Sequence, residues 1–198
     1  MIYRGTAGWR IWEISRYNIR YKYKEEIGMD RIYYDAIEGN PVIAAVKDMD
    51  GLRRCCELED IRVVFILFGD ICSIGDIVGR VKETGRLALV HVDLVTGLSS
   101  KEVAVDYIRE HTEADGIITT RPPLIRRGKE LSLCTVLRYF LIDSMALASI
   151  KNQQSMVRPD FIEVLPGLMP KIIENISSST RTPIIAGGLI TDKEAVMG

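Results

Sequence analysis

The sequence predicts an α/β protein of the TIM-barrel type, in which strands and helices alternate and the strands run parallel. Three observations lead to this prediction. Short apolar runs rich in β-branched residues recur at intervals of roughly 20 to 26 residues, as expected for buried parallel strands. Helix-like spacing of apolar residues fills the intervals, and each run ends in polar residues or glycine. An open sheet also gives alternating strands and helices, so the choice between sheet and barrel depends on the residues at the strand ends.

Seven apolar runs are expected to form the strands, and a helical pattern follows each of them. In chain order, the runs and the residues at or after their ends are 41–46 with Lys47-Asp48, 62–68 with Gly69-Asp70, 87–92 with Asp93, 116–118 with Thr119-Thr120, 133–137 with Arg138, 161–165 with Pro166-Gly167, and 183–186 with Gly187-Gly188. Two helices carry the capping-box pattern S/T-x-x-E at 99–102 and 191–194, which predicts helix starts there.

Charged residues at four different strand ends favour the closed barrel. Lys47, Asp93, Arg138 and Glu163 come from four strands, and in an open sheet only those near the switch point could converge. In a barrel all four face one mouth, where cations and carboxylates together suit a small polar anion. The alternative is that these charges simply pair with one another inside the end of the barrel.

Glycines and a histidine add to this mouth. Gly187-Gly188 follows the seventh strand, where barrels often bind phosphate on backbone N–H groups; a tight turn is the alternative. His91 lies two residues before Asp93, so alternation places both on one side of the strand. It is either a proton-transfer residue or a hydrogen-bonded core histidine. The sequence contains no nucleophile elbow, P-loop or GxGxxG motif, and it gives no catalytic set.

Composition narrows the class of protein. The chain has 198 residues, a net charge of −1 and 47% hydrophobic residues, which suits one domain with a substantial core and argues against a protein-wide basic field. No apolar run is long enough to span a membrane. Four cysteines without a CxxC pair, and only two histidines, argue against a zinc site and for reduced thiols in a cytoplasmic protein. No cofactor is expected.

The first 33 residues differ from the rest. Residues 1–34 hold both tryptophans and six of the eight tyrosines, mixed with basic residues as in the run 20–24, RYKYK. Such a mixture can bind single-stranded RNA, with cations on phosphates and rings on bases. The favoured interpretation is a disordered extension or one translated from an upstream start, with Met29 as the authentic start. Residues 34–198 are expected to form the single domain.

Several segments together resemble a known family. They are NPVIAAVKD (40–48), FILFGDI (65–71), VHVDLVTGLSS (90–100), ADGIITT (114–120), FLIDSMAL (140–147), PDFIEVLPGLMPK (159–171) and TPIIAGGLIT (182–191). In this order they resemble the glycerol uptake operon antiterminator regulatory proteins, over residues 35–198. The resemblance implies a TIM-barrel-like sensor of sn-glycerol 3-phosphate. In its liganded form such a protein binds the mRNA leader of glycerol-utilisation genes and permits read-through of a terminator.

The resemblance also implies which residues bind the effector. By motif position these are Lys47, Asp93, Glu163, Gly167, Gly187 and Gly188, and Arg138 is added from its strand-end position. Cations and glycine N–H groups are expected to bind the phosphate, and carboxylates the glycerol hydroxyls. For RNA, the densest basic cluster is Arg121, Arg126, Arg127 and Lys129, with Arg53-Arg54 as a second; a solvated helix face is the alternative for both. A homo-oligomer is one way in which the ligand could favour RNA binding.

One feature of the chain departs from this family, and one other function competes with the regulatory one. The chain stops at 194–198, before an eighth strand, so it is expected to be a fragment whose first and seventh strand edges are exposed. The competing function is a TIM-barrel enzyme acting on a small phosphorylated substrate. It would need an acid–base pair at the mouth, for which His91 with Asp93 or Glu163 is the candidate.

Overall fold

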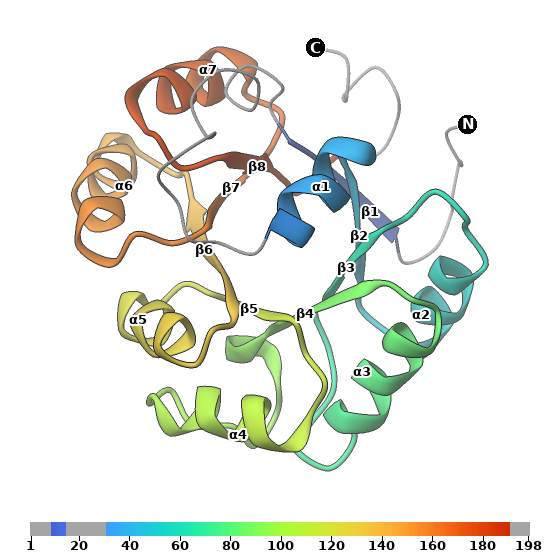
Figure 1. Cartoon of the computed structure of the whole chain (residues 1–198). Coiled ribbons are helices and arrows are strands. Elements are labelled where there is room, and N and C mark those ends of the chain that lie inside the picture. Colours follow the sequence, from blue (N-terminus) through green and yellow to red (C-terminus); the bar gives the residue numbers. More distant parts are fainter. Residues whose placement is uncertain (1–8, 15–30, 191–198) are drawn as a thin grey trace.

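The computed structural model describes residues 9–14 and 31–190, which form a ring of strands surrounded by helices (Figure 1). The strands are β1 (Trp9–Ile14), β2 (Val42–Val46), β3 (Val63–Ile66), β4 (Leu87–His91), β5 (Gly116–Thr119), β6 (Cys134–Phe140), β7 (Phe161–Leu165) and β8 (Ile184–Ala186). The helices are α1 (Arg31–Gly39), α2 (Met49–Cys56), α3 (Ile74–Glu83), α4 (Val103–His111), α5 (Pro122–Glu130), α6 (Ser144–Val157), α7 (Pro170–Ser179) and the short 3-10 helix η1 (Val92–Leu94). Within the described ranges, no helix is both long and apolar enough to cross a membrane.

Seven strands, β2 to β8, pair in parallel in chain order, which confirms the predicted TIM-barrel-like fold. The described part of the chain contains no eighth parallel strand. The expectation of two exposed strand edges is wrong. The unpredicted strand β1 lies antiparallel between β2 and β8, pairing Trp9 with Val46 and Glu13 with Ala186, and closes the sheet. Its backbone therefore pairs with the edges that seven strands alone would leave free.

Alternation along the strands divides the core into the inside of the barrel and the layer under the helices. Side chains such as Ala45, Phe65, Val136 and Phe161 fill the inside of the barrel. The residues between them in sequence pack outward against the helices, as Val64 does among the residues of α2 and α3. All of the parallel strands are therefore buried on both faces, which is why they read as continuous apolar runs.

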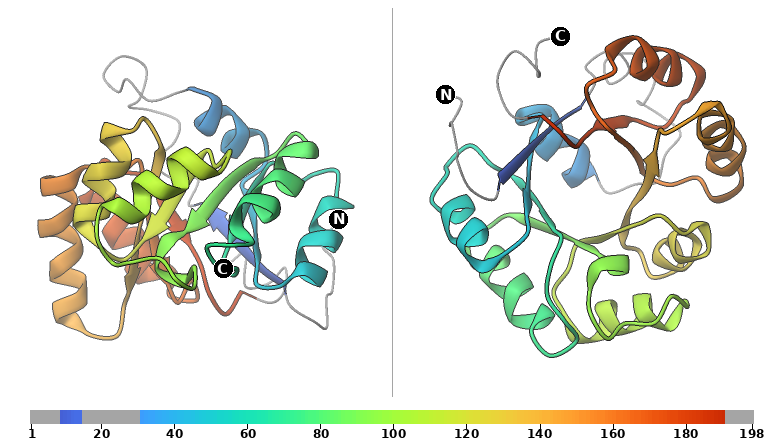
Figure 2. Two further views of the ribbon diagram at one scale, coloured as in Figure 1. Left: turned by 90° about the horizontal axis from the view of Figure 1, so that it is seen from below. Right: turned by 180° about the vertical axis from the view of Figure 1, so that it is seen from behind.

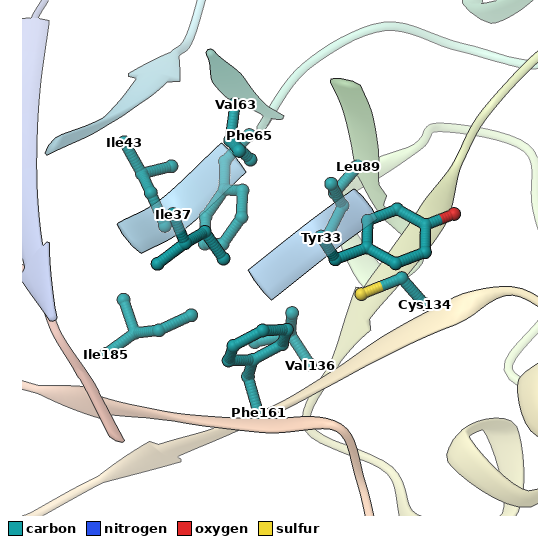
Figure 3. Close-up of a pocket in the computed structure, with 10 residues that line it drawn as sticks. All are labelled: Tyr33, Ile37, Ile43, Val63, Phe65, Leu89, Cys134, Val136, Phe161 and Ile185. Atoms are coloured by element: carbon teal, nitrogen blue, oxygen red, sulfur yellow. The ribbon is translucent and has the colours of Figure 1, made fainter. Parts of the chain in front are cut away.

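Helix α1 closes one end of the barrel, as the left view of Figure 2 shows. Tyr33 and Ile37 on α1 line a small apolar cavity with side chains of the barrel interior (Figure 3). The Tyr33 hydroxyl donates to the backbone carbonyl of Asp115, just before β5, at 2.8 Å, and Tyr34 packs on Phe161 with ring centroids 5.3 Å apart. This end carries the amino termini of the parallel strands, so α1 covers the end of the barrel opposite their carboxyl ends.

Two aspartates fasten the amino-terminal ends of the strands in the same way. Asp160, just before β7, accepts hydrogen bonds from the Thr135 N–H on β6 at 2.8 Å, from the Thr135 hydroxyl at 2.6 Å and from the Lys129 ammonium at 2.8 Å. Asp115, before β5, accepts from the Ala88 N–H on β4 at 2.8 Å and from Lys82 at 2.7 Å. Asp160 thus connects β6 and β7 to α5, and Asp115 connects β4 and β5 to α3.

The predicted helix start at the first capping box is wrong. Helix α4 begins at Val103, and its cap residue Glu102 makes no side-chain hydrogen bond to the helix. The Ser99 hydroxyl instead accepts from the Lys101 N–H at 3.3 Å, so it stabilises a turn before the helix. The second box, 191–194, lies outside the described residues.

We expect Asp160→Ala to lower the free energy of unfolding by about 3 kcal/mol, because it leaves the buried Thr135 N–H without its acceptor and Lys129 without its partner. Urea unfolding followed by circular dichroism measures the change. Glu113→Ala is the matched control, since Glu113 is an exposed acid at the same end of the barrel. Equal losses in the two variants would contradict the fastening role of Asp160.

Candidate functional site

The carboxyl ends of the parallel strands meet at the barrel mouth opposite α1. Side chains of the interior alternate along each strand, so the position two residues beyond an interior side chain faces the mouth. Leu89 is interior on β4, Val136 on β6 and Phe161 on β7. His91, Arg138 and Glu163 are therefore the next inward positions of these strands.

Arg138 and Glu163 form a buried ion pair inside the barrel. They are register partners on β6 and β7, and their side chains are 5% and 0% exposed. Arg138 donates from Nε to Glu163 Oε2 and from Nη2 to Oε1, the latter at 3.2 Å. Burial raises the pKa of the Glu163 carboxyl, and the charge and hydrogen bonds of Arg138 oppose this rise. The two charges thus pair with each other, as the alternative sequence interpretation expected of charges at the barrel end.

The Asp93 carboxylate connects the end of β4 to the end of β5 by hydrogen bonds. Its two carboxylate oxygens accept from the Thr119 hydroxyl at 3.0 and 3.1 Å, from the Thr120 N–H at 2.8 Å and from its hydroxyl at 3.1 Å, and from Arg121 Nε at 3.2 Å. Asp93 therefore lies at the mouth as expected, with both oxygens already engaged. Sequence reasoning missed Thr119 and Thr120 as its partners, although their position at the end of β5 was the available signal.

His91 is buried beside this group without forming an acid–base pair. It is 3% exposed, and its Nδ1 is 3.9 Å from Asp93 Oδ2, beyond hydrogen-bonding distance. Burial and the nearby Arg138 charge lower the pKa of His91 to about 3, and Asp93 only partly offsets them. The imidazole is neutral at physiological pH and a weak base, which does not suit proton transfer.

Lys47 follows β2 directly and is exposed at the mouth. The next residue, Asp48, begins α2 by accepting a hydrogen bond from the Gly51 N–H at 2.6 Å, which fixes the backbone at this strand end. Lys47 forms no ion pair within the described part of the chain. It is thus a cation whose charge remains available to a ligand.

The glycines after β7 and β8 bring two loops into close contact. The Gly167 N–H donates to the Gly188 carbonyl at 3.2 Å, and the Gly187 N–H donates to the Val164 carbonyl at 2.9 Å. A Cβ on Gly167 would lie 2.8 Å from the Gly187 nitrogen, so a larger residue cannot fit. Gly188 has a φ of 74°, as the tight-turn interpretation requires. Of the three, Gly188 has the N–H that donates no hydrogen bond to the described residues.

The basic cluster is largely neutralised by ion pairs. Arg127 contacts Asp106 at 2.6 Å and Glu130 at 2.8 Å, Lys129 contacts Asp160, and Arg121 contacts Asp93. Arg126 is exposed and has no ion pair among the described residues. In the second candidate, Arg53 pairs with Asp50. The geometry thus resembles the alternative, a solvated helix face, except at Arg126.

The cysteines and acidic residues form no candidate metal site in residues 9–14 and 31–190. No group of three or more metal-ligating side chains is found there. The four thiols are free, and burial raises the pKa of Cys55 to about 12, which keeps this thiol protonated.

Comparisons with known proteins agree on one family. A family model described as glycerol-3-phosphate responsive antiterminator matches residues 42–198. The chain is 41% identical to the protein YgcP of Escherichia coli strain K12, over 78% of this chain and 81% of that protein.

Two solved structures are also similar. A glycerol uptake operon antiterminator regulatory protein from Listeria monocytogenes has a TM-score of 0.74 and 31% identity, over 77% of this chain and 82% of that one. A glycerol uptake operon antiterminator-related protein from Thermotoga maritima has a TM-score of 0.69 and 33% identity, over 78% of this chain and 86% of that one.

We expect Arg138→Met to destabilise the fold by about 4 kcal/mol at pH 8, because Glu163 is left buried without its partner. Without Arg138 the pKa of Glu163 in the folded state rises further above its unfolded value. The folded state then holds a proton that the unfolded chain has lost, so stability falls as the pH increases. Urea unfolding should therefore show a smaller loss at pH 5 than at pH 8.

The double variant Arg138→Met with Glu163→Leu is the control, since it removes both charges together. It should recover most of the lost stability at pH 8. A loss in the single variant that is the same at both pH values would contradict the ion-pair interpretation.

Proposed function

Because the chain belongs to the glycerol-3-phosphate responsive antiterminator family, we propose that it binds sn-glycerol 3-phosphate at the barrel mouth. The liganded protein then binds the mRNA leader of glycerol-utilisation genes and allows transcription to pass a terminator. In this proposal the protein is a cytoplasmic regulator and not an enzyme, and it needs no metal or organic cofactor.

One observation carries the ligand site: Lys47 is a cation without an ion-pair partner in the described chain, placed at the rim of a mouth whose deeper charges are already paired. An anion is the ligand that best suits these charges. A cation would be repelled by the Lys47 ammonium, and a neutral molecule would leave that charge without a partner. The uncommitted Gly188 N–H is a second donor for a phosphate oxygen. Glycerol hydroxyls would then meet the polar groups that remain, Glu163 and Asp93 among them.

The state of His91 supports a regulator over the competing enzyme. An acid–base enzyme at this mouth needs a group that gains and loses a proton near neutral pH. The pKa of His91 is lowered to about 3, Glu163 is held by Arg138, and both oxygens of Asp93 accept hydrogen bonds. These groups can bind a ligand, but none of them is poised to transfer a proton.

Arg121 offers a route from ligand to RNA. It is half exposed, begins the segment that leads into α5, and its Nε donates to Asp93 at the mouth. A ligand hydroxyl that bonds to Asp93 competes with Arg121 for the same carboxylate. In our proposal the released guanidinium joins Arg126 on the outside of α5 and increases affinity for RNA phosphates.

We expect Lys47→Ala to weaken binding of sn-glycerol 3-phosphate by about tenfold or more, because one charge-assisted contact with the phosphate is lost. Isothermal titration calorimetry measures this affinity. Arg62→Ala is the matched control, as Arg62 is exposed at the amino-terminal end of β3, across the barrel from the mouth. Equal affinity of the wild-type protein and the Lys47 variant would remove Lys47 from the site.

For RNA, we expect the wild-type protein to bind its leader more tightly with sn-glycerol 3-phosphate than without it, and Arg121→Ala to lose most of this difference. The ligand no longer has a guanidinium to release in that variant. Fluorescence anisotropy of a labelled leader, measured over a salt series, gives both affinity and salt slope.

Two further variants make the RNA experiment specific. Arg126→Ala should lower the salt slope by about 1, as expected for one lost phosphate contact. Arg109→Ala, which removes an exposed charge near the end of α4, should leave it unchanged. Leader binding that does not depend on the ligand in the wild-type protein would refute the antiterminator mechanism.

A further inference from the structure

His91 carries a polar atom for which the fold provides no partner. The side chain is 3% exposed, its Nδ1 has no hydrogen bond, and the nearest carboxylate oxygen, on Asp93, is 3.9 Å away. A buried polar atom left without a partner costs about 1 to 3 kcal/mol, so such atoms are rare in native structures. An unpaired ring nitrogen beside a candidate ligand site indicates that a further group completes it.

The imidazole faces the same interior space as the buried ion pair. Leu89 points into the barrel, so His91, two residues further along β4, does so as well. Arg138 and Glu163 reach the interior by the same alternation on β6 and β7. After burial, the Arg138 charge is the main cause that lowers the pKa of His91.

The charges of the mouth change with depth. At the deep level Arg138 and Glu163 neutralise each other, and the imidazole is uncharged. At the rim, Lys47 is exposed and carries an unpaired positive charge within the described chain. A phosphate placed deep would approach the Glu163 carboxylate and lose its water, whereas at the rim it meets Lys47 and keeps part of its hydration.

We propose that His91 is a specificity-determining residue: its Nδ1 forms a hydrogen bond with a hydroxyl at the neutral end of a small phosphorylated polyol, whose phosphate faces the rim. This inference rests on the proposed function. It adds the orientation of the ligand and a residue that recognises a ligand hydroxyl by a hydrogen bond. A neutral imidazole suits a neutral hydroxyl, because Nδ1 either donates or accepts a hydrogen bond, depending on the tautomer, and a hydroxyl can do both. Phosphate esters without hydroxyls would bind through the rim alone.

The test compares three ligands by isothermal titration calorimetry: sn-glycerol 3-phosphate, propyl phosphate, which lacks the hydroxyls, and inorganic phosphate. In His91→Phe we expect affinity for sn-glycerol 3-phosphate to fall about tenfold, and affinity for the other two to stay unchanged. His91→Asn, whose amide lies close to the position of Nδ1, should recover part of the loss. Lys47→Ala should weaken all three ligands together.

A measurement on the unmodified protein covers the case in which His91 variants fold poorly. With histidine labelled by nitrogen-15, sn-glycerol 3-phosphate should shift the His91 Nδ1 resonance, and inorganic phosphate should leave it in place. The exposed His111 is the reference in the same spectra.

The outcomes separate the two proposals. If the wild-type protein binds none of the three ligands, the proposed function fails and the inference with it. If it binds sn-glycerol 3-phosphate while His91→Phe binds it equally well, or the Nδ1 resonance does not move, the inference alone is overturned. A loss that is equal for all three ligands in His91→Phe also overturns it, since His91 would then act on the phosphate or on the fold.

Discussion

The bidentate ion pair between Arg138 and Glu163 determines what the inside of this barrel can hold. Both side chains are almost fully buried, where an unpaired charge would cost several kcal/mol. The two residues are register partners on the adjacent strands β6 and β7, so their side chains lie directly opposite each other. The consequence of this ion pair reaches beyond stability, because the guanidinium charge adds to burial, the larger cause, in lowering the pKa of His91. The ion pair and the neutral imidazole together leave the deep end of the mouth uncharged overall.

The two ends of the barrel are built for different purposes. At the amino-terminal end α1 covers the opening. The carboxylate oxygens of Asp115 and Asp160 accept hydrogen bonds there from strand N–H groups and from lysines. At the carboxyl-terminal end the loops hold uncommitted donors, among them Lys47 and the Gly188 N–H. Polar groups satisfied at one end and left available at the other are the usual division of a TIM-barrel protein into a stable face and a binding face.

The sequence was sufficient for the parallel strands but not for the closure of the sheet. Runs such as 161–165 are apolar on both faces, so their period and composition identify them without tertiary information. Strand β1 could not be found in this way, because its pairing with β2 and β8 depends on contacts distant in sequence. The same holds for α1, whose Tyr33 bonds to a carbonyl 82 residues away.

At the mouth, the positions of side chains were predictable and their partners were not. Alternation predicted that His91 and Asp93 lie on one side of a strand, but β4 ends at His91 and Asp93 belongs to η1. The pattern also could not tell whether the two side chains bond to each other. The outcome was decided by Thr119 and Thr120, which come from the neighbouring strand and occupy the Asp93 oxygens. Likewise, the basic residues of α5 form a cluster in sequence, whereas the fold pairs two of them, Arg127 and Lys129, with Asp106 and Asp160 from outside this helix. Local patterns give the direction of a side chain, and only the fold gives its partner.

These arrangements bear on how such a barrel can regulate rather than catalyse. A sensor needs groups that bind a ligand differently in two states of the protein, and it gains nothing from a group that changes its own protonation. In the function that we propose, Asp93 meets this requirement, because its carboxylate holds Arg121 and exchanges that partner for a ligand hydroxyl. The exchange conserves the number of hydrogen bonds inside the mouth, so its cost is small, while it frees a positive charge on the outside of the barrel. In the proposed mechanism, a ligand that contributes a few kcal/mol of binding free energy can drive this exchange. RNA that takes up the freed charge would, by reciprocity, strengthen ligand binding by the same factor.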